Sequence, residues 1–169
     1  MSTAKRALRL RAEVPGEVPA TAMIMAAGLG KRMRPLTATR PKPLIEVGGK
    51  ALLDHVLEKL SVAGVKKVVV NVHYLAEALE GHLLSRNHGL EVVISDERDL
   101  LMETGGGLVK AAPLIDCDPF LALNSDNLWI DGPADALKLL ASQWDDSKMD
   151  ALLLLVPLAR GLNHSGIRS

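Results

Sequence analysis

Residues 21–37, "TAMIMAAGLGKRMRPLT", decide the fold, because a short apolar segment runs directly into a basic, glycine-rich loop. The apolar part, 21–27, predicts a buried strand. Gly28 and Gly30 allow the backbone to approach a ligand closely, and five cations without a carboxylate fall within 30–42. Cationic side chains and free backbone N–H groups together favour phosphate. The alternative, a solvated basic turn, is disfavoured by the position straight after the first strand.

Two common phosphate-binding patterns do not fit this loop. A P-loop requires glycine where Met25 stands, and Ser or Thr directly after Lys31, where the chain has Arg32. A dinucleotide fingerprint requires a third glycine where Met33 stands. The remaining pattern, G-x-G-K-R-M-x-P-L-T, therefore predicts a phosphate site of another type.

Strand-like and helix-like segments alternate along the rest of the chain. Further strands are expected over 66–72, 90–95, 118–126 and 150–159, and helices over 51–64, 75–86, the start of 106–115 (ended by Pro113) and 132–144 (with Pro133 in its first turn). This alternation indicates an α/β fold, a Rossmann-like doubly wound, mostly parallel sheet with helices on both faces. Such sheets bind ligands beyond the carboxyl ends of their strands. The polar residues of 27–37, 71–74, 95–107 and 124–127 should gather there.

Length and composition fit one globular domain with a sizeable core. The chain has 169 residues, 48% of them hydrophobic, and its twenty basic and twenty acidic residues cancel, which disfavours binding to nucleic acid or a membrane surface. The longest apolar run, 151–159, is far shorter than the roughly 20 residues of a membrane-spanning helix. The first twenty residues lack the continuous apolar segment of a secretion signal. A single cysteine, Cys117, suits a reducing compartment, so a cytoplasmic location is expected.

Three parts of the chain are expected to differ in character. Residues 1–20, broken by Pro15, Gly16 and Pro19, are expected to form a mobile extension. Residues 21–158 are expected to form the domain, and 159–169 a tail with little apolar material. The sequence does not predict an oligomeric state.

Four ordered motifs resemble the sugar-1-phosphate nucleotidyltransferases. They are "MIMAAGLGKRMRPLTATRPKPLIEVGGKALLDH" (23–55), "VVVNVHYLAE" (68–77), "METGGG" (102–107) and "FLALNSDNLW" (120–129). The last two are most similar to the branch that contains N-acetylmuramate-1-phosphate uridylyltransferase and mannose-1-phosphate guanylyltransferase-like proteins. The resemblance, over about 21–158, implies a fold of the nucleotide-diphospho-sugar transferase type. It also implies a reaction in which a sugar 1-phosphate oxygen attacks the α-phosphorus of an NTP in line and pyrophosphate leaves.

The resemblance implies roles for the residues of the basic loop. The nucleotide-binding residues would be Ala27, Gly28, Gly30 and Lys31. Arg32 would hold the β- and γ-phosphates as pyrophosphate leaves, and Lys42 would bind the α-phosphate and its developing charge. For Lys31 and Arg34, ordinary solvent exposure is an equally good interpretation.

The other two motifs supply the rest of the implied site. The stretch "ETGGG" would contact the nucleotide through Glu103, Thr104, Gly105 and Gly106, and the sugar would be bound by Glu103 and Asn124. The alternative for this stretch is a flexible helix entry with Thr104 as its cap. His73 is expected to be a packing residue rather than a catalyst.

Asp126 is the implied ligand of Mg²⁺, the expected cofactor, and the third catalytic residue with Arg32 and Lys42. Mg²⁺ prefers oxygen ligands and is commonly bound by one or two carboxylates together with substrate phosphates. Ser125 stands where the family more often has glycine, which would narrow the space beside the nucleotide. The alternative for Asp126 is a turn-forming aspartate.

The family usually continues past this point with a second metal-binding aspartate, but no Asp or Glu follows Asp150 in this sequence. The C-terminal part of the family is therefore expected to be missing through truncation or a frameshift. Two hypotheses remain, a sugar-1-phosphate nucleotidyltransferase and an NTP-binding remnant or regulatory module without turnover. UTP with N-acetylmuramate 1-phosphate is preferred over GTP with mannose 1-phosphate. A third hypothesis, a cytidylyltransferase of the isoprenoid or lipopolysaccharide type, is weaker because "ETGGG" and "RPLT" match it less well.

Overall fold

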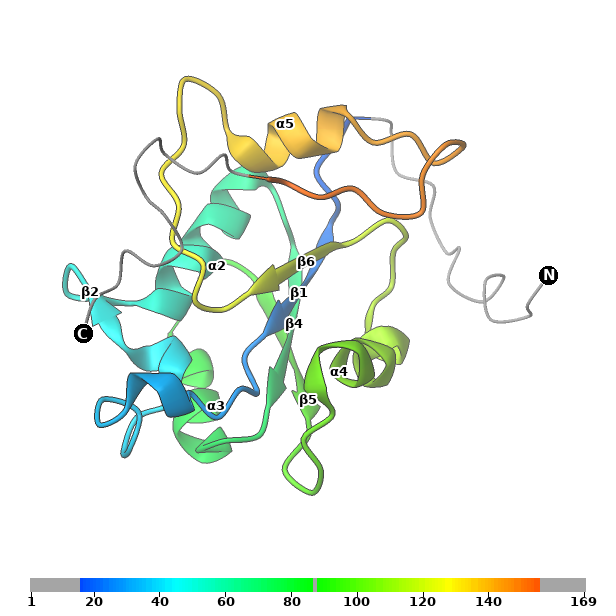
Figure 1. Ribbon diagram of the computed structural model, residues 1–169. Coiled ribbons are helices and arrows are strands. Elements are labelled where there is room, and N and C mark those ends of the chain that lie inside the picture. Colours follow the sequence, from blue (N-terminus) through cyan, green and yellow to red (C-terminus); the bar gives the residue numbers. More distant parts are fainter. Residues whose placement is uncertain (1–15, 87, 156–169) are drawn as a thin grey trace.

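The central element of the fold is a four-stranded sheet, seen in a computed structural model that describes residues 16–86 and 88–155 (Figure 1). Its strands are β1 (Thr21–Met25), β4 (Lys67–Val72), β5 (Glu91–Asp96) and β6 (Leu121–Asn124). Their spatial order is β5-β4-β1-β6, and every neighbouring pair is parallel. The predicted α/β class with a Rossmann-like parallel sheet is confirmed.

The two inner strands are apolar on both faces because both faces of the sheet are covered. Ala22 of β1 lies opposite Val68 of β4 on one side and Leu121 of β6 on the other. Ala22, Met23 and Val68 have no exposed surface. A continuous apolar run is the pattern expected of such a doubly covered parallel strand.

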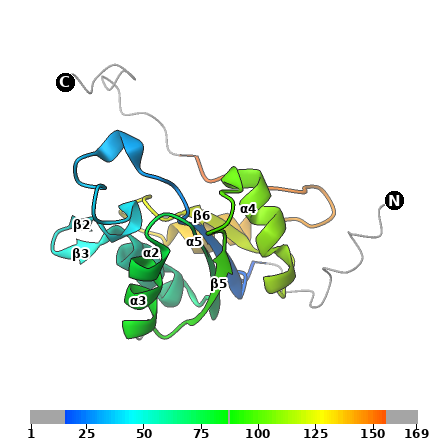
Figure 2. The ribbon, with the colours of Figure 1, turned by 90° about the horizontal axis from the view of Figure 1, so that it is seen from below.

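Helices cover the two faces unequally. The helices α2 (Leu52–Ala63) and α3 (Ala76–Ser85) lie on one face, and α4 (Glu103–Ala111) lies on the other (Figures 1 and 2). The larger core cluster packs apolar side chains of α2 and α3, such as Leu57 and Leu79, against the sheet. The smaller cluster packs Ala111 against Met23 and Val69 on the opposite face. The short helix α5 (Ala136–Ser142) joins the larger cluster through Leu137.

Several short elements escaped prediction. A hairpin of β2 (Glu46–Val47) and β3 (Lys50–Ala51) precedes α2, with Gly48 and Gly49 at φ 62° and 78° in its turn. Single 3₁₀ turns span Lys31–Met33, Lys42–Leu44 and Ala112–Leu114. A two-glycine turn between short extended segments is a hairpin signal, so the hairpin was visible in the sequence.

Three predicted elements need correction. The helix expected to start at 106 begins at Glu103. Pro133 lies outside α5, which begins at Ala136 because the carboxylate of Asp135 accepts hydrogen bonds from Leu137 N (2.9 Å) and Lys138 N (3.0 Å) and caps it. Over 150–155 the strand expected at 150–159 is absent, and Leu153 and Leu155 are 75% and 78% exposed. The rest of that expected strand, residues 1–15 of the expected extension and the C-terminal tail lie outside the described residues.

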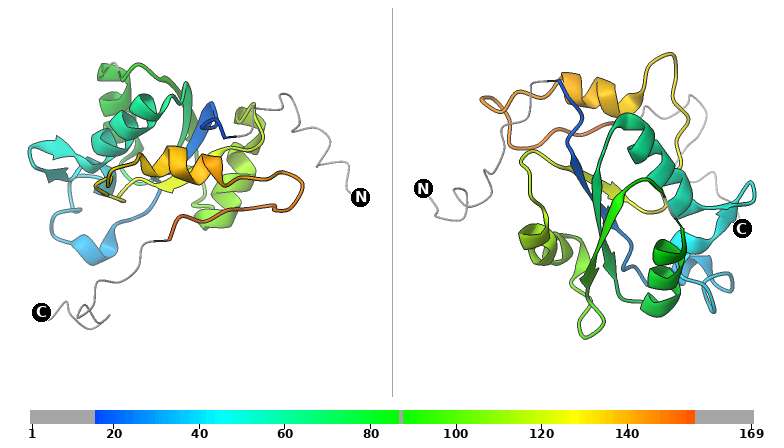
Figure 3. Two further views of the ribbon diagram at one scale, coloured as in Figure 1. Left: turned by 90° about the horizontal axis from the view of Figure 1, so that it is seen from above. Right: turned by 180° about the vertical axis from the view of Figure 1, so that it is seen from behind.

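The strand order reverses at β1, since β4 and β5 follow on one side of it and β6 on the other (Figure 3). In an open α/β sheet, a crevice forms outside the carboxyl ends of the strands where the order reverses. The chain segments that leave β1 and β6 therefore flank the favoured ligand position. None of the helices in the described part of the chain has the length and apolarity needed to cross a membrane.

Candidate functional site

A cavity of about 490 Å³ lies at the carboxyl ends of β1 and β6, where the strand order reverses. We name it the β1 cavity. Its lining comes from distant parts of the sequence, namely 25–33, 42–43, Asn71, Leu101 with 103–104, and 124–126. The lining includes the predicted site residues Ala27, Gly28, Gly30, Lys31, Arg32, Lys42, Glu103, Thr104, Asn124 and Asp126. Gly105 and Gly106 are not part of it.

Asn71 fixes the start of the loop that follows β1. Its side-chain oxygen accepts hydrogen bonds from Ala26 N (2.6 Å) and Ala27 N (3.2 Å), and Asn71 itself is 3% exposed. The following backbone from Gly28 onward lines the cavity. A β4 side chain thus holds the backbone that leaves the neighbouring strand β1.

Gly30 and Thr37 fix the far part of the same loop. Gly30 has a φ of 61°, and a Cβ atom added to it would lie 2.8 Å from the Thr37 methyl carbon, so only glycine fits here. The buried Thr37 hydroxyl donates a hydrogen bond to the Gly30 carbonyl (2.8 Å). The Tyr74 hydroxyl donates to the carbonyl oxygens of Thr37 (2.9 Å) and Ala38 (3.2 Å). The loop is therefore held in one conformation at both ends.

The cations of the loop differ in their surroundings. Lys31, Arg32 and Arg34 are exposed and form no ion pair within residues 16–86 and 88–155. Of these, Lys31 and Arg32 line the β1 cavity. Unpaired cations beside free backbone N–H groups give this side of the cavity the character of an anion site.

Lys42 and Asp126 meet across the cavity as an ion pair. Lys42 begins a 3₁₀ turn after Pro41, and Asp126 follows the last residue of β6 by two positions. Their side chains are 27% and 30% exposed, so both remain within reach of a ligand. A bound phosphate group could take the place of Asp126 as the partner of Lys42, and a bound cation could take the place of Lys42 as the partner of Asp126.

The donor set around Asp126 fits Mg²⁺ only together with a bound nucleotide. Within the described residues, no group of three or more His, Cys, Asp or Glu side chains could hold a metal ion. One carboxylate plus substrate phosphate oxygens is, however, a common Mg²⁺ environment. Asp126 is the residue that would supply the carboxylate, and the phosphates would supply further oxygens.

The glycine run 105–107, expected to form a contact loop, lies in the first turns of α4. Glu103, its first residue, has a φ of 57° and lines the β1 cavity with Thr104. A Cβ on Gly107 would lie 2.7 Å from Glu97 Oε1 and 2.9 Å from Asn71 Nδ2. Gly107 therefore serves close packing of α4 on the sheet edge, and only the start of the motif reaches the cavity.

Glu97 escaped the sequence analysis. It is completely buried although it stands within the charged stretch "SDERD", and its neighbours Asp96 and Arg98 are paired with each other at the surface. Local composition predicts solvent exposure for such a residue. No signal in the sequence distinguished it from the acidic residues around it.

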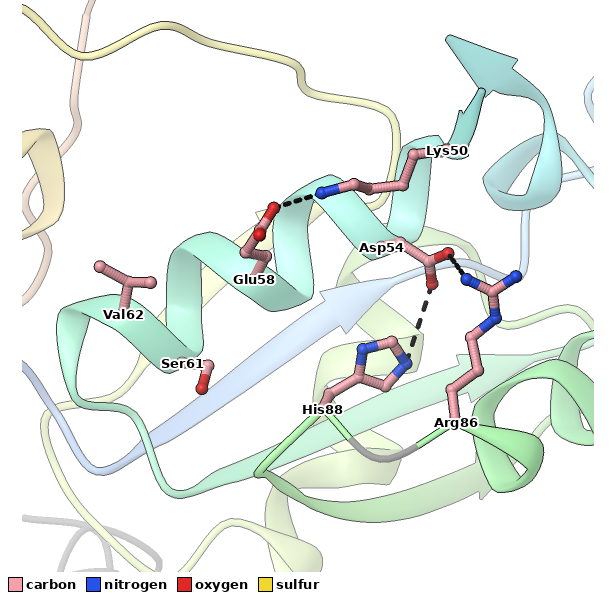
Figure 4. A pocket seen from close by; sticks show the side chains of 7 residues that line it. All are labelled: Lys50, Asp54, Glu58, Ser61, Val62, Arg86 and His88. Atoms are coloured by element: carbon pink, nitrogen blue, oxygen red, sulfur yellow. Dashed lines mark hydrogen bonds and ion pairs between the residues drawn. The ribbon is translucent and has the colours of Figure 1, made fainter. Parts of the chain in front are cut away.

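A second cavity, of about 550 Å³, lies beside α2 and is lined by Lys50, Asp54, Glu58, Ser61, Val62, Arg86 and His88 (Figure 4). We name it the α2 cavity. Lys50 is paired with Glu58, and the buried Asp54 is bound by Arg86 (2.8 Å) and His82 (2.7 Å). Its charged groups already neutralise one another, so the β1 cavity is the better candidate site.

Comparisons with known proteins place the chain among the nucleotidyltransferases. The nucleotidyl transferase family matches residues 21–160. The chain is 47% identical over 149 residues to N-acetylmuramate alpha-1-phosphate uridylyltransferase of Caulobacter vibrioides, covering 86% of this chain and 62% of the relative. It is 41% identical over 109 residues to mannose-1-phosphate guanyltransferase of Neurospora crassa, covering 62% of this chain and 30% of the relative. The chain thus spans less than two thirds of these relatives.

Two solved structures share the fold at 25% identity or more. HddC from Yersinia pseudotuberculosis, complexed with GMP-PN, has a TM-score of 0.58 and 27% identity, covering 64% of this chain and 48% of its own. A UDP-glucose pyrophosphorylase complexed with UDP-glucose has a TM-score of 0.60 and 25% identity, covering 72% and 52%. The fold expected from the sequence motifs is confirmed.

Proposed function

The chain belongs to the nucleotidyl transferase family, and from that premise we propose that it acts in joining an NTP to a sugar 1-phosphate with release of pyrophosphate. The observation that carries the proposal is the meeting of the loop 27–32, Lys42 and Asp126 around one cavity. These groups come from distant parts of the sequence and have complementary chemistry toward a metal-bound triphosphate.

The proposed reaction needs positioning and charge neutralisation more than covalent chemistry. Backbone N–H groups of the loop, with Lys31 and Arg32, bind the β- and γ-phosphates. Lys42 binds the α-phosphate and stabilises the negative charge that develops as the sugar phosphate oxygen attacks. Asp126 would hold Mg²⁺, which would reduce the charge repulsion between the two phosphate groups.

The start of α4 and the end of β6 would bind the base and the sugar. Glu103 and Thr104 line the β1 cavity on the side of α4, and Asn124 lines it on the side of β6. Carboxylate, hydroxyl and amide groups match the hydroxyl and amide groups of a ribose, a base or a sugar. In this proposal Gly105 and Gly106 contribute through the backbone of the helix start alone.

UTP and N-acetylmuramate 1-phosphate are the proposed substrates. The support is the 47% identity to the Caulobacter vibrioides uridylyltransferase over most of this chain. GTP with mannose 1-phosphate is the alternative, supported by the shorter match to the Neurospora crassa enzyme. The first pair would place the protein in cell-wall precursor metabolism and, with its soluble substrates, in the cytoplasm.

A second candidate function is binding of NTP without turnover. It is favoured by the arrangement of the two carboxylates that line the β1 cavity. Asp126 is already paired with Lys42, and Glu103 lies apart from it at the start of α4. Such a site can bind a triphosphate through its cations without holding one metal ion between two carboxylates.

Pyrophosphate release with UTP, GTP, CTP and ATP, each with N-acetylmuramate, mannose or glucose 1-phosphate and with or without Mg²⁺, tests the proposal. We expect Mg²⁺-dependent release with UTP and N-acetylmuramate 1-phosphate. Release with GTP and mannose 1-phosphate alone would support the alternative substrates. Calorimetric binding of an NTP without pyrophosphate release under any condition would support the binding function, and the absence of both would refute the two candidates.

A further inference from the structure

Glu97 is a carboxylate with no exposed surface that is hydrogen-bonded to Asn71, a residue of the β1 cavity wall, and to Met102, the residue before Glu103. Glu97 follows β5, and its backbone N–H donates a hydrogen bond to the carbonyl of Val72 (2.8 Å), the last residue of β4. Within residues 16–86 and 88–155, its side chain takes part in no ion pair with a Lys, Arg or His. Burial of a carboxylate is costly, so its oxygens need hydrogen-bond donors.

Two donors from opposite sides satisfy this carboxylate. Asn71 Nδ2 donates to Glu97 Oε1 (2.9 Å), and the backbone N–H of Met102 donates to Glu97 Oε2 (3.1 Å). Met102 directly precedes Glu103, which lines the cavity. One oxygen is thus connected to β4 and the other to the entry of α4.

The connection continues through Asn71 to the phosphate-binding loop. The amide oxygen of Asn71 accepts hydrogen bonds from Ala26 N and Ala27 N, while the amide nitrogen donates to Glu97. A chain of hydrogen bonds therefore runs from the loop after β1, through Asn71 and Glu97, to the backbone before Glu103. One end is the backbone of Ala26 and Ala27 in the cavity wall, and the other is the backbone of Met102, which lies between the lining residues Leu101 and Glu103.

We propose that Asn71 and Glu97 are positioning residues that hold the phosphate-binding loop and the entry of α4 in one fixed relation. This inference rests on the proposed function, because it gives the two ends of the β1 cavity to the phosphates and to the base or sugar. Glu97 does not line the cavity, and Asn71, which does, has both atoms of its side-chain amide engaged in these hydrogen bonds. The pair therefore acts through the distance that it sets between the loop backbone after β1 and the backbone before Glu103.

The residue types match this task closely. The Ala26, Ala27 and Met102 N–H groups are all donors. The two side chains that connect them must therefore present an acceptor to each of these N–H groups, and one of them must donate a hydrogen bond to the other. An amide beside Ala26 and a carboxylate beside Met102 meet this requirement. A glutamine at 97 alone would lose one acceptor, and an aspartate at 71 alone would set two carboxylates against each other.

The same donors and acceptors show that the amide and the carboxylate can be exchanged between positions 71 and 97. In a protein with both Asn71→Asp and Glu97→Gln, the aspartate accepts from Ala26, Ala27 and the glutamine amide, and the glutamine oxygen accepts from Met102. Every hydrogen bond between the loop, positions 71 and 97, and Met102 is then restored, and the net charge of the protein is unchanged. Only the long contact from Asn71 Nδ2 to Met25 Sδ (3.9 Å) is not replaced. Packing against Gly107 is also preserved, because the new side chains have the same shapes as the old ones.

The test is a double-mutant cycle of these two substitutions, read as the affinity for UTP with Mg²⁺ at a temperature where circular dichroism shows each protein folded. Each single variant should bind UTP about tenfold to a hundredfold more weakly, the range for one charged hydrogen bond. The double variant should recover most of that loss. Asp96→Asn is the matched control, since it makes the same acid-to-amide change at the adjacent, exposed position.

Amide hydrogen exchange gives a second readout that needs no nucleotide. In Glu97→Gln, the Ala26 and Ala27 amides should exchange faster than in the unchanged protein, although their direct partner Asn71 is intact. Full UTP affinity in the folded single variants, no recovery in the double variant, or unchanged exchange at Ala26 and Ala27 would each overturn the inference. A failure of the unchanged protein to bind any NTP would instead refute the proposed function, and the exchange measurement would still decide the inference.

Discussion

Lys42 and Asp126 form an ion pair across the β1 cavity although 84 positions in the sequence separate them. Each residue belongs to a different wall of the cavity, one to the turn after Pro41 and the other to the chain that leaves β6. A half-buried pair of this kind keeps both charges at the β1 cavity without a ligand. The pair therefore gives two separate predictions, one for each partner.

Lys42→Met should lower the rate of pyrophosphate release by about 10²- to 10³-fold, the usual effect of removing one group that stabilises developing charge. The measurement is the steady-state rate with saturating UTP, N-acetylmuramate 1-phosphate and Mg²⁺. Lys50→Met is the control, because Lys50 is paired with Glu58 beside the α2 cavity. An unchanged rate in Lys42→Met would exclude the proposed role of this residue.

Asp126→Asn should remove most of the gain in UTP affinity that Mg²⁺ provides, because the variant lacks the carboxylate proposed to hold the ion. Without Mg²⁺ the variant should bind UTP at least as tightly as the unchanged protein, since a negative charge facing the phosphates is gone. Calorimetric titrations with and without Mg²⁺ measure both effects. Asp145→Asn, at a surface ion pair with Lys148, should behave as the unchanged protein. If Mg²⁺ raises the UTP affinity of Asp126→Asn and of the unchanged protein equally, the assignment of Asp126 as a metal ligand is wrong.

Gly107→Ala should destabilise the fold by about 1–3 kcal/mol, the usual cost of overpacking. The added methyl group would meet Glu97 Oε1 at 2.7 Å and Asn71 Nδ2 at 2.9 Å, and both atoms are held by hydrogen bonds. Gly105→Ala is the matched control in the same helix, because a Cβ there meets nothing within 4 Å. It should leave stability unchanged or raise it by up to about 1 kcal/mol. Urea unfolding measures both changes, and equal stability of the two variants would contradict the packing role of Gly107.

Acidification should destabilise the protein partly through His88. Burial lowers the pKa of His88, and the neighbouring His82 and Arg86 act in the same direction, while Asp54 opposes the shift. The unfolded chain therefore takes up a proton at a higher pH than the folded protein does. The contribution of His88 to stability is complete above the unfolded-state pKa of about 6.5 and is lost as the pH falls from there toward the lower folded-state pKa.

The free energy of unfolding should accordingly fall between pH 7.5 and 5.5, and by less in His88→Asn than in the unchanged protein. Urea unfolding at both pH values gives the two differences to be compared. Ser61→Ala alters the same cavity without a titrating group, so it should keep the pH dependence of the unchanged protein. The same loss of stability in His88→Asn and the unchanged protein would show that His88 takes no part in the acid sensitivity.

The sequence predicted the sheet well because periodicity and burial agree in its strands. "TAMIM" and "KVVVNV" are apolar on both faces and lie in the two inner strands. The expected strand at 150–159 was wrong over 150–155, although these residues are just as apolar, because pattern alone does not supply a neighbouring strand. Apolar character thus predicted a strand only where a pairing strand lies within residues 16–86 and 88–155.

The candidate site was predictable to a similar degree, and for a related reason. Lys42 and Asp126 stand in motifs that resemble the family. The resemblance implied that both belong to one site, and both line the β1 cavity. Glu97 gave no such signal, because its importance arises from burial between Asn71 and the Met102 N–H. Contacts between segments far apart in the sequence create that environment, and a single sequence does not record them.

The close approach of Gly107 to Asn71 and Glu97 also limits how these positions can vary among related proteins. A side chain larger than glycine at 107 needs the space that Glu97 and Asn71 occupy. We therefore expect any larger residue at 107 to be accompanied by shorter side chains at 71 and 97. Co-substitution of amide and carboxylate between 71 and 97 should likewise occur as a paired exchange, leaving glycine at 107 in place.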